Sequence, residues 1–219
     1  PLARRQSGGC CQRMIAGTVT KPPGGFPVNS LLSVLFAAFV LATVSAAPAH
    51  AEDGLAAKLA EPGHIAIMRH ALAPGTGDPA NLTLDDCATQ RNLSEAGRRQ
   101  ARRTGDFLRS VGVAGARVFS SQWCRCIDTA ELLDLGPVEP LPALNSFFRN
   151  RERGPEQTRA LRDKIAGMDL SRPVVMVTHQ VNITRLTDVF PSSGEIVVLR
   201  RAADGELDVL GTVDPRSTQ

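Results

Sequence analysis

The sequence lacks the cysteine and histidine spacings of a zinc site. Its five cysteines and four histidines form no C-x-x-C and no H-x-x-x-H pattern, and Cys124 and Cys126 stand too close together for a paired zinc knuckle. Such spacings matter because neighbouring side chains must reach one ion. We therefore expect neither a metal nor a cofactor.

A strong excess of basic charge is also missing from most of the chain. Four of the 25 Lys and Arg residues lie before residue 52, where no Asp or Glu occurs. The remaining 21 basic residues stand against 22 acidic ones, which gives that part a net charge of −1. Proteins that bind nucleic acid usually carry a basic surface. The charge therefore gives no support to a nucleic-acid partner.

Long apolar runs are absent except for one near the start of the sequence. No residue from Ser30 to Ala47 is charged, basic residues precede this run, and the small-x-small sequence Ala49-His50-Ala51 follows it. This order is typical of a secretory signal peptide, and an uncleaved membrane anchor is the alternative. We expect residues 1–51 to be a leader that is removed. Residues 52–219 would then form one periplasmic or secreted domain without stable membrane insertion.

After the leader, short apolar segments alternate with segments of helical periodicity. Strands are predicted at His64–Arg69, Arg117–Ser121 and Pro173–His179, and a terminal hairpin at residues 195–213. Helices are predicted at 52–61, 93–110, 123–133, 156–168 and 181–189, and an extended segment at 137–144. This alternation indicates an α/β fold, a three-layer α/β/α sandwich with a mostly parallel central sheet.

Three predicted strands end on residues that can carry chemistry. These ends are Arg69-His70, Ser120-Ser121 and Thr178-His179. Ligands of open α/β sheets bind where the carboxyl ends of the strands meet. We therefore expect one site there, with Arg125 on the next helix beside it and the loop from Leu72 to Asn92 as part of its wall.

Arginine and histidine together suit phosphoryl transfer without a metal. A guanidinium group holds phosphate oxygens through two parallel hydrogen bonds and keeps its charge. A neutral histidine nitrogen can attack phosphorus and form a covalent intermediate. Arginines and a second, protonated histidine can then stabilise charge on the equatorial oxygens.

Four motifs follow one another along the chain after residue 63. They are Arg69-His70-Ala71, the segment Leu93–Ala101 (L-S-E-A-G-R-R-Q-A), the segment Ser120–Ala130 (S-S-Q-W-C-R-C-I-D-T-A), and Val177-Thr178-His179. Together they resemble the signature of the histidine phosphatase superfamily, in its phosphoglycerate-mutase-like branch 1. The one departure within them is Ala71, where the family has glycine.

The resemblance implies a phosphoglycerate-mutase-like fold and roles for four residues. His70 would be the phosphorylated nucleophile, Arg69 and Arg125 the phosphate clamp, and His179 the second histidine in contact with the phosphoryl group. The chain would then be a phosphatase that hydrolyses a small phosphomonoester through a phosphohistidine intermediate. A non-catalytic module of the same fold that binds phosphate or a phospho-ligand is the alternative.

The resemblance fails at the group that protonates the leaving oxygen. Many family members carry a glutamate after a Leu-Asn pair, whereas Leu144-Asn145 is followed here by Ser146, whose hydroxyl is a poor proton donor near neutral pH. Water could serve, or the leaving group, such as phosphohistidine, could need no acid. A third alternative is a carboxylate from elsewhere: Asp78, Asp85, Asp86 or Glu152.

The substrate itself is not readable from the motifs. We expect specificity to come from the Leu72–Asn92 loop and the Pro142–Gly154 segment. In an oxidising compartment, Cys87 in this loop could form a bridge to Cys124 or Cys126, which flank the clamp arginine. Free buried thiols are the alternative.

Overall fold

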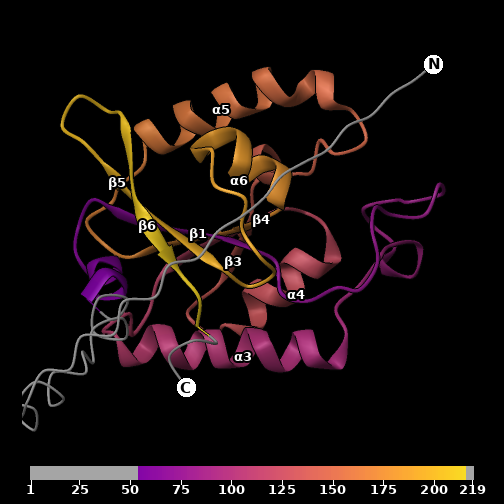
Figure 1. Cartoon of the computed structure of the whole chain (residues 1–219), viewed down its shortest axis with the longest axis horizontal. Coiled ribbons are helices and arrows are strands. Elements are labelled where there is room, and N and C mark those ends of the chain that lie inside the picture. Colours follow the sequence, from indigo (N-terminus) through magenta and orange to yellow (C-terminus); the bar gives the residue numbers. More distant parts are fainter. Residues whose placement is uncertain (1–53, 216–219) are drawn as a thin grey trace, which may run out of the picture. The chain divides into compact units, whose positions relative to one another are not determined.

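The computed structural model describes residues 54–215 of the chain, and the predicted leader and its cleavage site lie outside this range. Within it, no helix combines the length and apolar character that a membrane span requires. The described part contains one six-stranded sheet with helices on both faces (Figure 1).

The sheet has the strand order β3-β2-β4-β1-β5-β6. Its strands are β1 (His64–Arg69), β2 (Arg117–Ser120), β3 (Val138–Pro140), β4 (Val174–Thr178), β5 (Ile196–Arg201) and β6 (Leu207–Val213). The first four run parallel to one another, and β5 pairs antiparallel with both β1 and β6. The prediction of a mostly parallel sheet with a terminal hairpin is confirmed.

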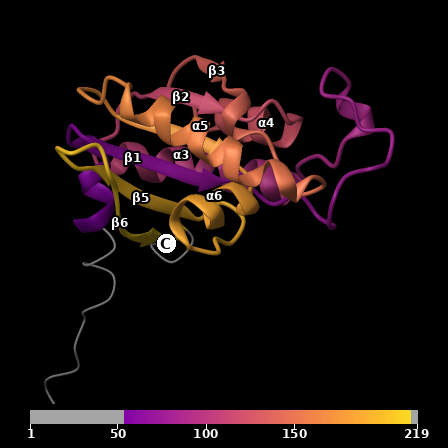
Figure 2. The ribbon, with the colours of Figure 1, turned by 90° about the horizontal axis from the view of Figure 1, so that it is seen from above.

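Helices cover the sheet in two layers (Figures 1 and 2). Helices α3 (Glu95–Ser110) and α4 (Cys124–Leu132) pack on one face, and α5 (Gly154–Ala166) and α6 (Gln180–Thr187) pack on the other. Four short 3-10 helices complete the order: η1 (Lys58–Ala60), η2 (Cys87–Thr89), η3 (Pro142–Leu144) and η4 (Arg151–Arg153). The three-layer α/β/α prediction is thus confirmed. Helix α5 begins two residues earlier than predicted, because proline is tolerated in a first turn.

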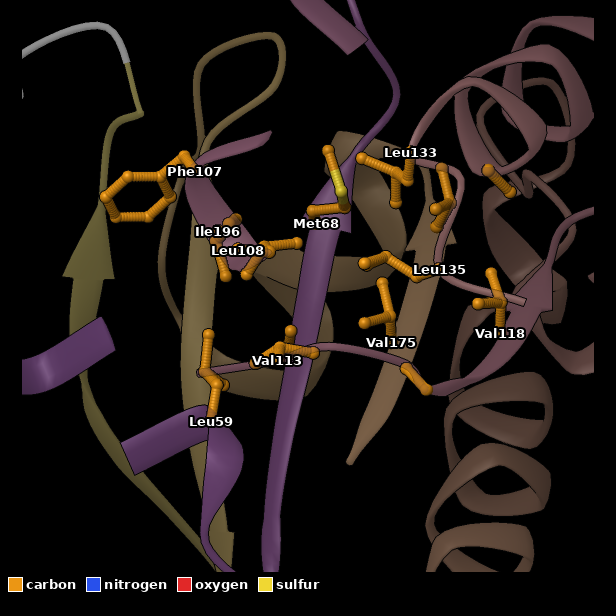
Figure 3. Close-up of a cluster of buried hydrophobic side chains, with 14 of the residues drawn as sticks. Leu59, Met68, Phe107, Leu108, Val113, Val118, Leu133, Leu135, Val175 and Ile196 are labelled. Atoms are coloured by element: carbon orange, nitrogen blue, oxygen red, sulfur yellow. The ribbon is translucent and has the colours of Figure 1, made fainter. Parts of the chain in front are cut away.

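The hydrophobic core consists of two layers because side chains alternate along each strand. On β1, Ala66 and Met68 join the cluster under α3 and α4 (Figure 3). Ile65 and Ile67 point the other way and join the cluster under α5 and α6. With both faces covered, the central strand is apolar from Ile65 to Met68 and buried from His64 to Met68.

Strand register brings the carboxyl ends together. Arg69 is opposite Thr178 in the pair of β1 and β4, and Ser120 is opposite Val177 in the pair of β2 and β4. The residues that follow these three ends therefore emerge at one edge of the sheet. This edge is where the sequence predicts the site.

The loop Leu72–Asn92 joins β1 to α3 and projects from the body of the domain (Figure 2). At its root, the Leu72 amide donates to Gln100 Oε1 over 2.9 Å. Helix α3 passes so close that a Cβ at Gly97 would lie 2.1 Å from the Leu72 carbonyl oxygen. Glycine is required at this position because any side chain would push the loop root off the helix.

Candidate active site

The two histidines and Arg125 meet at this edge as predicted. His70 follows β1, Arg125 is the second residue of α4, and His179 immediately precedes α6. Arg125 Nε donates to His70 Nε2 over 3.2 Å, and Arg125 Nη2 lies 3.4 Å from His179 Nδ1. The two imidazole rings stand edge to face with centroids 5.6 Å apart. All three side chains are buried.

Arg69 is half-buried and lines the same cavity of about 110 Å³ as these three residues. Its Nη1 donates to the carbonyl oxygen of Pro191 over 3.1 Å. Its Nε is buried and has no hydrogen-bond partner among the described residues. Because an unpaired buried donor is costly, this N–H is available for an oxygen of a bound anion.

The surroundings of His70 fix its tautomer. Its Nδ1 lies 2.8 Å from the carbonyl oxygen of Ala71, which can only accept, so Nδ1 carries the hydrogen. The lone pair is then on Nε2, the atom that faces Arg125. Burial, and next the charge of Arg125, lower the pKa of His70 to about 3, so the ring is neutral near pH 7. A neutral ring with an unprotonated Nε2 is the form that a nucleophile needs, although Arg125 Nε donates to this nitrogen here.

Ala71 does not disturb this arrangement. It is not among the described residues with a positive φ, so the position does not need the backbone freedom of glycine. Its methyl group is fully buried in a small apolar cluster, and its amide donates to Thr129 Oγ1 over 3.0 Å. That hydroxyl donates in turn to the Arg125 carbonyl oxygen over 2.6 Å. Alanine at this position therefore leaves the hydrogen-bonded link between the segment after His70 and Arg125 intact.

His179 differs from the expectation of a protonated second histidine. Burial, followed by the neighbouring His70 and Arg125, lowers its pKa well below the usual value, so the ring is neutral. Its Nε2 lies 2.8 Å from Ser121 Oγ, and its ring packs edge to face on Trp123. The motif does not reveal this, because the protonation state depends on burial among arginines. A dianionic phosphoryl group would favour the protonated form.

The predicted loop supplies a third arginine that the motifs did not identify. Arg91 lines the cavity, its Nε donates to the Gly77 carbonyl oxygen over 2.8 Å, and its Nη1 contacts the Ala73 carbonyl oxygen. The role of the loop as a wall of the site is confirmed. The signal for Arg91 was its place just before the helix motif at Leu93, at the end of a Gly- and Pro-containing loop.

Of the four candidate carboxylates, only Asp78 lies in the cavity. Its two oxygens accept from both Nη atoms of Arg125, at 2.6 and 3.1 Å. Trp123 Nε1 and the Arg91 amide also donate to it, at 3.3 and 3.2 Å. Burial raises the pKa of Asp78, but its hydrogen bonds and Coulomb attraction to Arg125 outweigh this and lower the pKa overall.

The remaining candidates are excluded by position in this structure. Asp85, Asp86 and Glu152 are exposed and do not line the cavity, and the Asp86 side chain caps η2. Ser146 does line the cavity, and its hydroxyl accepts from the Phe148 amide over 3.3 Å.

A disulfide joins the loop to the start of α4. Cys87 is bonded to Cys124, the residue immediately before Arg125, while Cys126 is free and buried. Burial raises the pKa of Cys126 to about 12, so it remains an uncharged thiol. Of the alternatives left open by the sequence, the structure shows the bridge to Cys124. Among residues 54–215, no group of three or more His, Cys, Asp and Glu side chains is placed to hold a metal ion.

Comparison with known proteins gives one family match, over part of the chain. A family model described as histidine phosphatase superfamily (branch 1) matches residues 65–148. No curated protein matches the chain in sequence. The match covers the first motif, the helix motif and the segment with Arg125, and it confirms the recognition made from the motifs.

Three solved structures share the fold. The protein histidine phosphatase SixA complexed with tungstate has a TM-score of 0.52 and 18% identity, over 71% of this chain and 99% of that chain. YhfR of Bacillus stearothermophilus has 0.52 and 15%, over 68% and 95%. The phosphoserine phosphatase of Entamoeba histolytica in complex with 3-phosphoglyceric acid has 0.51 and 12%, over 71% and 99%. The comparisons support phosphatase activity at the level of the family, and the identities are those of a shared fold.

Proposed function

We propose that the chain is an exported phosphatase that hydrolyses a phosphomonoester through a covalent phosphohistidine at His70. The observation that carries this proposal is the neutral His70 Nε2, which faces a polar cavity lined by Arg69, Arg91 and Arg125. The export part of the proposal rests on the order of residues in the leader, and a disulfide is typical of exported proteins.

In the first step, Arg125 Nε turns from His70 Nε2 to a phosphoryl oxygen. The freed Nε2 lone pair then attacks phosphorus, and the bond to the ester oxygen breaks. The Nδ1 hydrogen stays on the ring and donates to the Ala71 carbonyl oxygen, which stabilises the positive charge that the ring gains. The Arg69 and Arg125 guanidinium groups stabilise the charge on the phosphoryl oxygens. In the second step, water attacks phosphorus, the P–N bond breaks, and inorganic phosphate leaves.

Asp78 is the group that we assign to proton transfer. Phosphoryl oxygens compete with its carboxylate for the two Nη atoms of Arg125. Once displaced from Arg125, Asp78 loses the largest of the interactions that lower its pKa, and its burial, which raises the pKa, remains. Substrate binding thereby favours a protonated carboxyl group, which gives its proton to the leaving oxygen. The resulting carboxylate then accepts a proton from the attacking water.

The second candidate function is a non-catalytic module that binds phosphate. Two observations favour it: serine stands at position 146, and a carboxylate already occupies Arg125. Both functions predict phosphate binding, so only turnover separates them.

The test is hydrolysis of an aryl phosphate, whose good leaving group needs little protonation. The native protein should turn it over and form an acid-labile, alkali-stable phosphoenzyme when quenched, whereas His70→Ala should do neither. His64→Ala is the matched control, since His64 is the buried histidine at the opposite end of β1 and contacts the Glu61 and Pro62 carbonyl oxygens. Full activity in His70→Ala would contradict the covalent mechanism. Binding of phosphate without turnover in the native protein would favour the second candidate.

A further inference from the structure

A second hollow opens beside the catalytic cavity. It is a groove of about 950 Å³ between α5 and α6, and the segment that follows η3 also lines it. The groove and the cavity share Phe148, Gln180 and Val181 in their walls, so the two hollows are adjacent. Its volume is at the upper end of the range for small-molecule sites.

The groove is rich in positive charge. Arg151, Arg159, Arg162 and Arg185 line it, and the only acidic side chain among its described lining residues is Asp188. None of the four arginines forms an ion pair within residues 54–215. Clustered guanidinium groups repel one another, so an arrangement without counter-charges favours the binding of anions.

Arg159 and Arg185 have the freest guanidinium groups in this set. Both are exposed, and no hydrogen bond within the described part of the chain occupies them. Arg162 already donates to the Leu186 carbonyl oxygen over 2.9 Å, and Arg151 lies 5.3 Å from the centroid of the Phe148 ring. Arg159 on α5 and Arg185 on α6 therefore face a ligand from two elements, with their donors available.

The groove also carries exposed aromatic surface. Phe190 is 73% exposed and Phe148 is 40% exposed, and both belong to the groove lining. Large apolar side chains in a concave surface indicate contact with a ligand. Phe148 stands where the groove meets the catalytic cavity, so a single ligand could contact it while its phosphoryl group reaches His70.

We infer that this groove binds the non-reacting part of the substrate, and that this part carries a second anionic group next to an apolar or aromatic surface. The inference rests on the proposed function, because it assigns the groove to the substrate of the same site. The wall shared with the cavity favours this occupant over a separate partner, and the arginines without ion pairs favour a second negative charge on it. The second anion can be a phosphate or a carboxylate, since guanidinium groups bind both.

The test uses three aryl phosphates of similar length with the purified protein. These are biphenyl-4-yl phosphate, biphenyl-4,4′-diyl bisphosphate and 4′-carboxybiphenyl-4-yl phosphate. The native protein should have a kcat/KM at least about tenfold higher for one or both of the compounds with a second anionic group than for the first compound. The preference between the last two compounds tells phosphate from carboxylate. Equal kcat/KM for all three would overturn the inference.

The double variant Arg159→Gln/Arg185→Gln should lower kcat/KM for the preferred compound about tenfold more than for biphenyl-4-yl phosphate. Arg99→Gln/Arg103→Gln is the matched control, because it removes two exposed arginines from α3 on the other face of the sheet. An equal loss in the two double variants would show bulk electrostatics and would overturn the inference.

The experiment distinguishes failure of the groove inference from failure of the proposed function. If no compound is hydrolysed, the proposed function fails, and calorimetry still measures whether Arg159→Gln/Arg185→Gln weakens binding of the bisphosphate relative to the monophosphate. If hydrolysis occurs without any preference among the compounds, the function stands and the groove inference fails. An acidic phosphopeptide is tested as a fourth compound. If it is the only compound hydrolysed, the inference of a small substrate is rejected.

Discussion

The exchange of one acidic group for its amide at Asp78 separates two roles of this residue. Asp78→Asn keeps the shape of the side chain but removes both its charge and its acidic proton. The native carboxylate holds both Nη atoms of Arg125, and the two side chains are 10% and 3% exposed. The residue thus competes with phosphate for the clamp and, in the proposed mechanism, protonates the leaving oxygen.

The two roles predict opposite effects on two measured quantities. Loss of a general acid lowers kcat by about 10²–10⁴ for an alkyl phosphate, whose leaving group must be protonated. For an aryl phosphate with a good leaving group, the loss should stay below about tenfold. Hydrogen bonds to charged groups contribute about 1.5–3 kcal/mol. Inorganic phosphate should therefore inhibit the variant about 10–100-fold more strongly, because no carboxylate competes for Arg125.

The assay is steady-state hydrolysis of β-glycerophosphate and p-nitrophenyl phosphate, with phosphate as the inhibitor. Asp85→Asn is the control, since Asp85 is an exposed carboxylate on the same loop. Equal losses for the two esters, or unchanged hydrolysis of the alkyl ester, would refute Asp78 as the acid. Unchanged inhibition by phosphate would refute its competition for Arg125.

Three other perturbations test the site and its support. Arg125→Ala should lower kcat/KM by about 10²–10³. It should also lower the free energy of unfolding by about 3–5 kcal/mol, because Asp78 is left buried without its partner. Adding Asp78→Asn to this variant should restore its stability, measured by urea unfolding, but not its activity. The pKa of His70 is about 3 in the folded chain, against a reference value of 6.5. As the pH falls, the unfolded chain therefore binds a proton at this histidine at a higher pH than the folded chain does. The free energy of unfolding should fall by on the order of 5 kcal/mol between about pH 6.5 and pH 3. His70→Asn should flatten this part of the pH curve, and an unaltered curve would contradict the burial of a neutral ring. Cys87 and Cys124 are 37 residues apart. Reduction of their disulfide should destabilise the protein by about 4 kcal/mol and lower Tm by about 10 °C. An unchanged Tm would show that the bridge does not constrain the unfolded chain.

The parts of the site that could be predicted are those carried by strand ends and local motifs. Apolar runs that stop at Arg69-His70 and Thr178-His179 place these residues at one edge, because parallel strands share their direction. Ser94 before a helical pattern predicts the start of α3, and its hydroxyl accepts from the Gly97 amide as expected of an N-cap.

The parts that could not be predicted depend on contacts between distant segments. Asp78 and Arg125 are 47 residues apart, and the loop that carries Asp78 has no periodicity to fix its path. The neutral state of His179 follows from burial among cations, which no local pattern encodes. Arg159 and Arg185 resemble ordinary exposed helix residues in the sequence, and only the packing of α5 beside α6 makes them two walls of one groove.

The anchoring of the Leu72–Asn92 loop restricts how molecules reach and leave the reaction centre. The loop is fastened at its root, where Gly97 admits the Leu72 carbonyl, and again near its end by the bridge to α4. A loop held at both ends is poorly suited to open and close over the site. We therefore expect substrate to enter and phosphate to leave by way of the adjacent groove, so that the surface that selects the substrate also admits it.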